Sequence, residues 1–292
     1  MEIRELLAGA GCDGWLCVME IDGDGEVHAG SDEPVVAASV FKVIVALEVF
    51  RQAAAGELDP RERVRARPGE TTLGPTGMSV FADEAEVSVR DLVTMMLTIS
   101  DNAATDLLVE RVGLDRMAAT LAELKLAGTA VPYSLGGLLD SIAVDVGLAT
   151  WRELMAAHHP AGPPDELLHA SRALRPEHSI RTTAGDMARL LKLIWLDRAG
   201  PAEACANVRA VMGQQITRHR LATGFPDDVR VAAKSGGLFG VVRNEVGVIR
   251  FPDGRRYAAA VFTRAHRPRA GENAINAVIG TVAAAAVASL RR

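Results

Sequence analysis

Strand-like segments lie near both ends of this chain, while the sequence between them has mostly helical periodicity. Near the N-terminus, a strand predicted at 15–21 turns through Asp22-Gly23-Asp24-Gly25 into a second strand at 26–29. Beyond Pro226, further strands are predicted at 229–233, 241–250 and 256–263. We therefore expect an α+β fold in which both ends of the chain build one antiparallel sheet and a helical region is inserted between them.

The inserted region is expected to contain a buried helix. The run from Val43 to Phe50 is apolar almost all round, which is typical of a helix inside a core. Helical periodicity returns at 89–99, and another helix is predicted directly afterwards at 103–112. Further helices are predicted at 2–9, 187–195, 203–216 and 274–290, and the stretch 113–187 is expected to be largely helical with breaks at Pro132, Gly136-Gly137 and 159–164.

Composition argues against several kinds of partner. The net charge is −5 and no basic stripe stands out, which argues against nucleic acid. The Ala-rich tail 274–290 is short for a membrane span, so we expect a docked terminal helix and no membrane partner. No basic segment followed by an apolar stretch opens the chain, which predicts a cytoplasmic location unless a leader precedes this sequence. Cys12, Cys17 and Cys205 lack metal-ligand spacing and are expected to be free thiols.

The first chemically suggestive motif is Ser39-Val40-Phe41-Lys42. Residues three apart lie on one helix face, so the hydroxyl of Ser39 and the amine of Lys42 can approach each other. Burial next to the apolar run would lower the pKa of Lys42, and a neutral amine can take a proton from a serine nucleophile. The alternative is a serine at a helix N-terminus followed by a lysine that extends to solvent.

Two further polar groups stand at predicted element boundaries. Ser100-Asp101-Asn102 occupies the break between two helices, where side chains can project into a cleft, although Asp101 or Asn102 also suits a helix N-cap. Lys234-Ser235-Gly236-Gly237 stands at the end of the strand predicted at 229–233 and offers a cation, a hydroxyl donor and an unobstructed backbone N–H. The alternative for the second group is a polar strand end with a glycine turn.

Together these groups resemble the signature of class A β-lactamases and penicillin-binding proteins, which is Ser-x-x-Lys, Ser-Asp-Asn and Lys-Thr-Gly in this order, with Ser235 replacing the threonine. The stretches 74–77 and 97–105, Thr182-Thr183 and Arg243-Asn244 extend the resemblance to roughly residues 15–290. It implies a β-lactamase/transpeptidase-like fold with a five-stranded antiparallel sheet flanked by terminal helices. The implied sheet subdomain is 1–32 with 188–292, the all-helical subdomain is 33–187, and the active site lies between them.

The resemblance also implies roles for individual residues. Ser39 would be the nucleophile, Lys42 its base or proton shuttle, and Ser100 the donor of a proton to the leaving nitrogen. The backbone N–H groups of Ser39 and Gly237 would form the oxyanion hole. The residues implied to bind substrate are Asn102 for an amide side chain, Lys234, Ser235 and Gly236 for a carboxylate, and Arg220 and Arg243 as possible assistants.

One part of the family pattern is missing. Class A β-lactamases carry Glu-x-x-Leu-Asn, whose glutamate activates the water that frees the acyl-enzyme, and no such sequence occurs here. Glu166 is the best substitute by its place before a leucine, although an exposed glutamate at a helix start fits equally well. The pair His158-His159 is another candidate base, or simply a solvated pair.

Three functions therefore stay open. The first is a serine hydrolase that opens β-lactam rings, with either efficient or weak turnover. The second is an esterase, amidase, peptidase or acyl-transfer enzyme of small-molecule metabolism, and the third is a β-lactam-binding sensor without turnover. The expected ligand is a β-lactam, ester or amide with a carboxylate. We expect no metal and no other cofactor, and a monomer with a dimer as the alternative.

Overall fold

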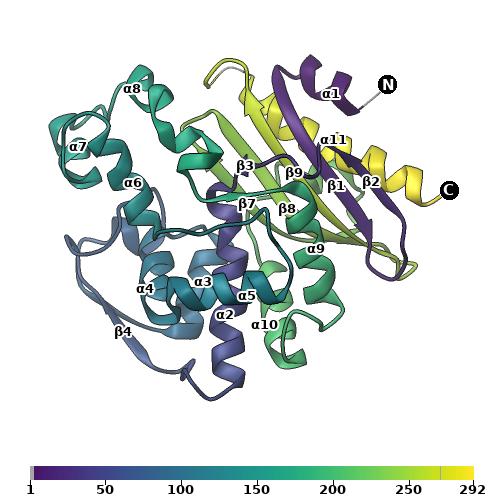
Figure 1. Ribbon diagram of the computed structural model, residues 1–292, viewed down its shortest axis with the longest axis horizontal. Helices are drawn as coiled ribbons and strands as arrows, with labels where there is room; N and C mark the ends of the chain where they lie inside the picture. Colours follow the sequence, from purple (N-terminus) through teal and green to yellow (C-terminus); the bar gives the residue numbers. More distant parts are fainter. Residues whose placement is uncertain (1–2, 270) are drawn as a thin grey trace.

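The N- and C-terminal segments pair into one five-stranded antiparallel sheet in the order β2-β1-β9-β8-β7 (Figure 1). The computed structural model describes residues 3–269 and 271–292. The sheet confirms the expected pairing of both chain ends. Its strands are β1 (Cys12–Glu20), β2 (Glu26–Ala29), β7 (Arg230–Leu238), β8 (Val242–Arg250) and β9 (Arg256–Ala265).

The predicted end of the first C-terminal strand was wrong. We expected this strand to end before the Lys234 motif, but β7 continues to Leu238. Gly236 and Gly237 stay paired with Asn244 and Arg243 of β8, so the two glycines do not form a turn. The motif is therefore held inside a rigid sheet, and the turn to β8 follows at 239–241.

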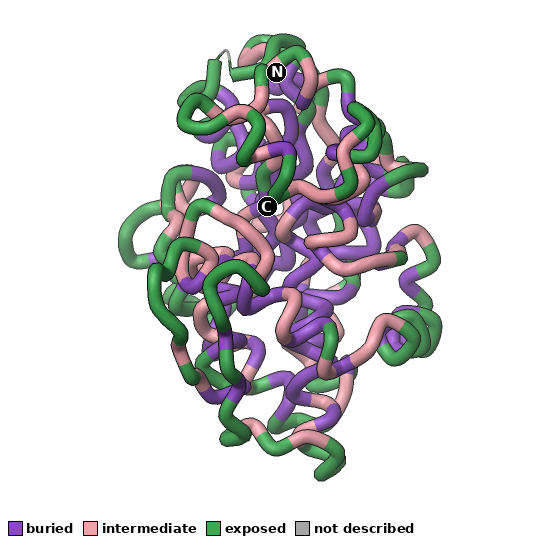
Figure 2. The backbone as a smooth tube through the Cα atoms, turned by 90° about the vertical axis from the view of Figure 1, so that its left-hand side faces the viewer, coloured by how far each residue is buried: buried purple, intermediate pink, exposed green. Residues whose placement is uncertain are grey.

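Side chains alternate between the two faces of the sheet, and each face is covered by helices. One face packs against α1 (Ile3–Gly9) and α11 (Glu272–Leu290), with Leu16, Val261 and Ile279 in the shared core. The other face packs against α9 (Ala184–Trp195), α10 (Ala202–Met212) and the central helix α2 (Lys42–Ala54). Figure 2 shows the buried segments running through the interior and the exposed ones in the outer loops. By length and composition α11 could cross a membrane, yet half of it is buried, in contact with the sheet.

The central helix α2 is buried nearly all round, as its apolar run predicted, because helices enclose it on the side away from the sheet. The enclosing helices are α3 (Val89–Thr98), α4 (Asn102–Val112) and α5 (Leu114–Glu123). Beside them stand α6 (Leu135–Val144), α7 (Trp151–Ala157) and α8 (Asp165–Ala170), which we call the helical arm (Figure 1).

Short elements connect the two halves. A small pairing joins β3 (Val35–Val36) to β6 (Arg181–Thr182), and β4 (Arg63–Ala66) pairs with β5 (Ala85–Ser88). The 3₁₀ helices are η1 (Ala38–Phe41), η2 (Gly77–Val80), η3 (Arg172–Leu174), η4 (Pro176–His178) and η5 (Leu221–Gly224). Helix α9 begins at Ala184 and packs on β1 and β9. The subdomain boundary expected at 187/188 falls inside this helix and stays a prediction.

Candidate active site

Ser39 lies on η1, the 3₁₀ turn that leads directly into α2, and it is partly exposed. Its predecessor Ala38 has a φ of 47°, a left-handed conformation that a residue other than glycine rarely adopts. Such strain persists only where surrounding contacts enforce it, and it is common at active sites. The serine is thereby presented at the surface end of an otherwise buried helix.

Lys42 connects two of the three motifs. Its Nζ donates to Ser100 Oγ at 3.2 Å, to the Ser100 carbonyl at 2.7 Å and to Asn102 Oδ1 at 3.1 Å. These contacts span about sixty residues of sequence and bring α2 against the break between α3 and α4. The structure thus joins the predicted residues Lys42, Ser100 and Asn102 in one cluster.

Burial changes the protonation of Lys42. The side chain is fully buried, and desolvation lowers its pKa well below the ordinary value. The charge of Lys234 lowers the pKa further, while Asp101 and Asp106 act in the opposite direction. An amine in this environment can be neutral, and a neutral amine can accept a proton from a hydroxyl.

Ser100 owes its position to backbone strain and to Asp101. Ser100 has a φ of 63°, which turns the chain sharply between α3 and α4. Asp101 is the N-cap of α4, as the simpler interpretation expected, and accepts from Ala104 N at 3.2 Å. Its other carboxylate oxygen accepts from Met78 N at 2.7 Å, so the same side chain also holds η2. Asp101 therefore stabilises the turn that presents Ser100.

Strand β7 passes directly beside Ser39. A Cβ atom added to Gly236 would lie 3.1 Å from both the Ser39 nitrogen and the Ala37 carbonyl oxygen, which is tighter than ordinary contact. A Cβ atom on Gly237 would meet nothing nearer than the Val242 carbonyl oxygen at 3.5 Å. Gly236 is thus required for the approach of β7 to η1, and Gly237 follows it along the same strand.

Lys234 is a second buried lysine on the strand. Burial lowers its pKa to about 7, against the opposing effect of Glu245, while Arg220 lowers it further. Its Nζ donates to the Ser235 carbonyl at 2.8 Å. The Ser235 nitrogen donates to Gln215 Oε1 at 2.6 Å, which fixes this part of the strand from outside the sheet.

Arg220 and Arg243 both extend toward α11. Arg220 is buried and donates to the Gly236 carbonyl at 2.7 Å and to Asn276 Oδ1 on α11 at 2.9 Å. Arg243 donates to the Gly240 carbonyl at 2.7 Å and pairs with Glu272 on α11 at 3.2 Å. Arg220 therefore holds the backbone of the Lys234 motif, whereas no contact in the described part of the chain joins either arginine to Ser39 or Lys42.

Glu166 has no polar contact with this cluster among the described residues. It is exposed in the first turn of α8 and has no hydrogen bond or ion pair within the described ranges 3–269 and 271–292. His158 Nδ1 contacts the Leu154 carbonyl of its own helix at 2.9 Å, and His159 is exposed. In the described part of the chain, no hydrogen bond or ion pair joins these three residues to Ser39, and their roles stay predictions.

The helical arm contacts the turn between β7 and β8. The rings of Trp151 and Phe239 lie 6.0 Å apart, and His169 Nε2 lies 3.0 Å from the Phe239 carbonyl oxygen. Asp165 pairs with Arg269 at 2.7 Å. The arm thus bridges from the helical half of the molecule to the sheet.

Sequence reasoning missed two supporting carboxylates. Asp106 follows Asn102 by one helical turn and accepts from Leu135 N, Gly136 N and Thr72 Oγ1 at 2.8, 2.6 and 2.6 Å, which fixes the start of α6. Only its spacing from Asn102 could have indicated it.

The second supporting carboxylate is Glu245 on β8. It is buried and accepts from Gln215 Nε2 at 3.0 Å and from Leu221 N at 2.5 Å, and burial raises its pKa. Gln215 in turn binds Ser235, so Glu245 supports the Lys234 motif indirectly. These contacts are long-range, and no local sequence pattern indicates them.

Comparisons with known proteins agree with this geometry. A model of the β-lactamase enzyme family matches residues 1–290. The β-lactamase regulatory protein BlaB of Streptomyces cacaoi is 28% identical over 299 residues, covering 97% of this chain and 94% of BlaB. The β-lactamase of Sphaerobacter thermophilus is 25% identical with a TM-score of 0.77, covering 98% of this chain and 97% of that chain. An ancestral class A β-lactamase is 21% identical with a TM-score of 0.78, covering 99% of this chain and 100% of its own. The predicted β-lactamase/transpeptidase-like fold is confirmed.

Proposed function

This chain belongs to the β-lactamase enzyme family, and from that premise we propose that it forms an acyl-enzyme with β-lactams on Ser39 and releases the acyl group slowly. The partners of Lys42 carry the proposal, because its side-chain contacts are Ser100 and Asn102. Within the residues that the structure describes, no carboxylate forms a hydrogen bond or ion pair with Ser39 or Lys42. Acylation needs only the serine and its base, whereas hydrolysis of the ester also needs a base for water.

In the proposed acylation, Ser39 Oγ attacks the lactam carbonyl carbon while neutral Lys42 takes the hydroxyl proton. The backbone N–H groups of Ser39 and Gly237 stabilise the negative charge that develops on the carbonyl oxygen. The carbon–nitrogen bond then breaks, Ser100 gives its proton to the nitrogen, and Lys42 returns a proton to Ser100. The contact of 3.2 Å between Lys42 Nζ and Ser100 Oγ supports this transfer.

The proposed ligand carries a carboxylate. Lys234 and Ser235 bind it, and because the pKa of Lys234 lies near 7, an approaching anion favours the charged amine. Arg220 contributes by fixing the Gly236 carbonyl, and Arg243 by holding the turn at Gly240. Asn102 Oδ1 accepts from Lys42 and its Nδ2 donates to the Leu73 carbonyl, so the second lone pair of Oδ1 is the proposed acceptor for an amide N–H of the ligand.

Slow release suits capture of a β-lactam as a signal. The regulatory role named for BlaB supports this use, and the absence of a carboxylate beside Ser39 and Lys42, among the residues that are described, supports the chemistry behind it. Glu166 is exposed and has no hydrogen bond or ion pair with the described residues of the cluster, so the proposal does not assign the base for water to it. Weak β-lactam hydrolysis is then the residual activity of such a protein.

Colour release from a chromogenic cephalosporin tests the proposal. We expect a burst equal to one equivalent of protein, followed by a much slower steady phase. Ser39→Ala removes the nucleophile without touching the core and should abolish the burst. Fast, continuous colour release would contradict slow deacylation. A simple ester turned over by Ser39 with no reaction toward the cephalosporin would instead indicate an esterase.

A further inference from the structure

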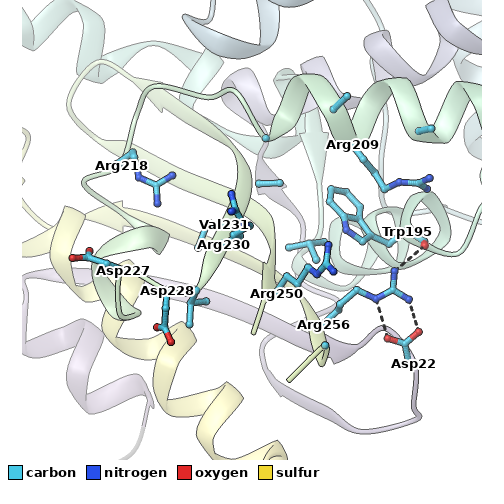
Figure 3. A pocket seen from close by; sticks show the side chains of 17 residues that line it. Asp22, Trp195, Arg209, Arg218, Asp227, Asp228, Arg230, Val231, Arg250 and Arg256 are labelled. Carbon is cyan, nitrogen blue, oxygen red and sulfur yellow. Dashed lines mark hydrogen bonds and ion pairs between the residues drawn. The ribbon is translucent and has the colours of Figure 1, made fainter. Parts of the chain in front are cut away.

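A groove of about 990 Å³ lies outside the active site, between α10 and the ends of β7, β8 and β9 (Figure 3). Arg230 begins β7 in this groove, four residues before Lys234. An extended strand rises about 3.3 Å per residue, so Arg230 and Lys234 are roughly 13 Å apart along β7, and the lining reaches Ala232 but includes neither Lys234 nor Ser39, Lys42 or Ser100. The groove is therefore separate from the catalytic cluster.

Three arginines form a row across the floor of the groove. In the strand register, Arg230 of β7 lies directly opposite Arg250 of β8, and Arg250 lies directly opposite Arg256 of β9. Directly opposed residues point to the same face, and like charges in such positions destabilise a sheet. With strands about 4.8 Å apart, the row is about 10 Å long. Three guanidinium groups are thus gathered on one face at this end of the sheet.

Much of this charge has no counter-charge. Arg256 is paired with Asp22, and Arg209 on α10 is paired with Asp197. In the described part of the chain, Arg218, Arg230 and Arg250 have neither an ion-pair nor a hydrogen-bond partner for their side chains. Asp227 and Asp228 also line the groove, and in Figure 3 they lie away from Trp195 and Arg256, on the side of Arg218.

An aromatic ring stands beside the arginines. Trp195, the last residue of α9, is partly exposed, and Figure 3 shows its side chain among those of Arg209, Arg250 and Arg256. Its carbonyl also accepts from Arg256 at 3.5 Å. Guanidinium groups bind phosphate oxygens in pairs, and an indole ring offers a flat apolar surface next to them.

We propose that this groove, defined by Arg218, Arg230 and Arg250 with Trp195 at its side, binds a small molecule that carries two adjacent phosphate groups. A ligand with more than one anionic group suits this site, because Arg218, Arg230 and Arg250 together carry three positive charges and a single phosphate carries at most about two negative charges near neutral pH. A free diphosphate and a nucleoside diphosphate share this chemistry. Only the nucleotide would also use the ring of Trp195.

Calorimetric titration of the full chain at low ionic strength tests the proposal. Pyrophosphate should bind saturably and more tightly than orthophosphate, and added sodium chloride should weaken it. Arg250→Gln should weaken pyrophosphate binding at least about tenfold, as expected for loss of a charge-assisted contact. Arg61→Gln is the matched control, since Arg61 is exposed on the helical half of the chain, and it should bind like the wild type.

Further measurements identify the ligand class and guard against misfolding. Tighter binding of ADP than of pyrophosphate, lost in Trp195→Leu, would assign the groove to nucleotides, and equal binding would assign it to the diphosphate alone. Without ligand, Arg250→Gln should melt at or above the wild-type temperature, because a like-charge contact is removed. The proposal is overturned by the absence of saturable pyrophosphate binding, by equal binding of orthophosphate, or by unchanged binding in Arg250→Gln.

Discussion

Two buried lysines dominate the chemistry of the site at the scale of single residues. Lys42 and Lys234 are both fully enclosed, and each has its pKa lowered mainly by burial. The charge of Lys234 also lowers the pKa of Lys42, so protonation of one amine disfavours protonation of the other. A neutral Lys42 beside a Lys234 that titrates near neutrality suits a base next to an anion-binding group.

The buried Lys234 predicts a pH-dependent stability. Its pKa falls from 10.5 to about 7 on folding. Between these values the unfolded chain keeps a proton that the folded chain has released, so the free energy of unfolding rises with pH. We predict that Lys234→Met lowers this slope by about 1 kcal/mol per pH unit, measured by urea unfolding from about pH 7.5 to 9.5. Parallel slopes for the variant and the wild type would contradict the lowered pKa.

At the scale of elements, the contact between β7 and η1 determines the geometry around Ser39. The strand passes within contact distance of the Ser39 nitrogen because Gly236 has no side chain. Pairing with β8 on one side and the Arg220 hydrogen bond on the other keep the strand in place. A small displacement here would change the position of the Ser39 and Gly237 N–H groups, which are proposed to bind the oxyanion.

Gly236→Ala tests this contact. Its new Cβ atom would press against backbone atoms of Ser39 and Ala37 at 3.1 Å, and backbone cannot give way as a flexible side chain can. We predict that the acylation rate falls about tenfold to a hundredfold, measured as single-turnover colour release from a chromogenic cephalosporin. Gly237→Ala is the control, because its nearest contact of 3.5 Å is ordinary and its N–H is kept. Equal effects of the two substitutions would refute the role of Gly236.

The sequence was sufficient to predict elements whose pattern is local. The strands near both ends, the buried helix from Lys42 and the break at Ser100 follow from periodicity and turn residues, and the structure contains all three. The end of β7 was mispredicted because two glycines indicate a turn, while the pairing that holds them straight comes from distant Asn244 and Arg243.

At the scale of the whole molecule, the site depends on contacts that join distant parts of the chain. Lys42 meets Ser100 across the helical half, and Gln215 joins Glu245 to Ser235 at the sheet. The helical arm reaches the β7–β8 turn at Phe239. Spacing along the sequence carries no information on such contacts, which explains why the support from Asp106 and Glu245 was missed and why the role of Glu166 stays a prediction.

Time-resolved intact-protein mass spectrometry with benzylpenicillin tests the central claim most directly. The account predicts one added penicilloyl mass per chain, located by peptide mapping on Ser39, which outlasts removal of free penicillin and is absent from Ser39→Ala. A chain that shows no adduct while penicillin is consumed, or that keeps the adduct in Ser39→Ala, would contradict a slowly released acyl-enzyme on Ser39.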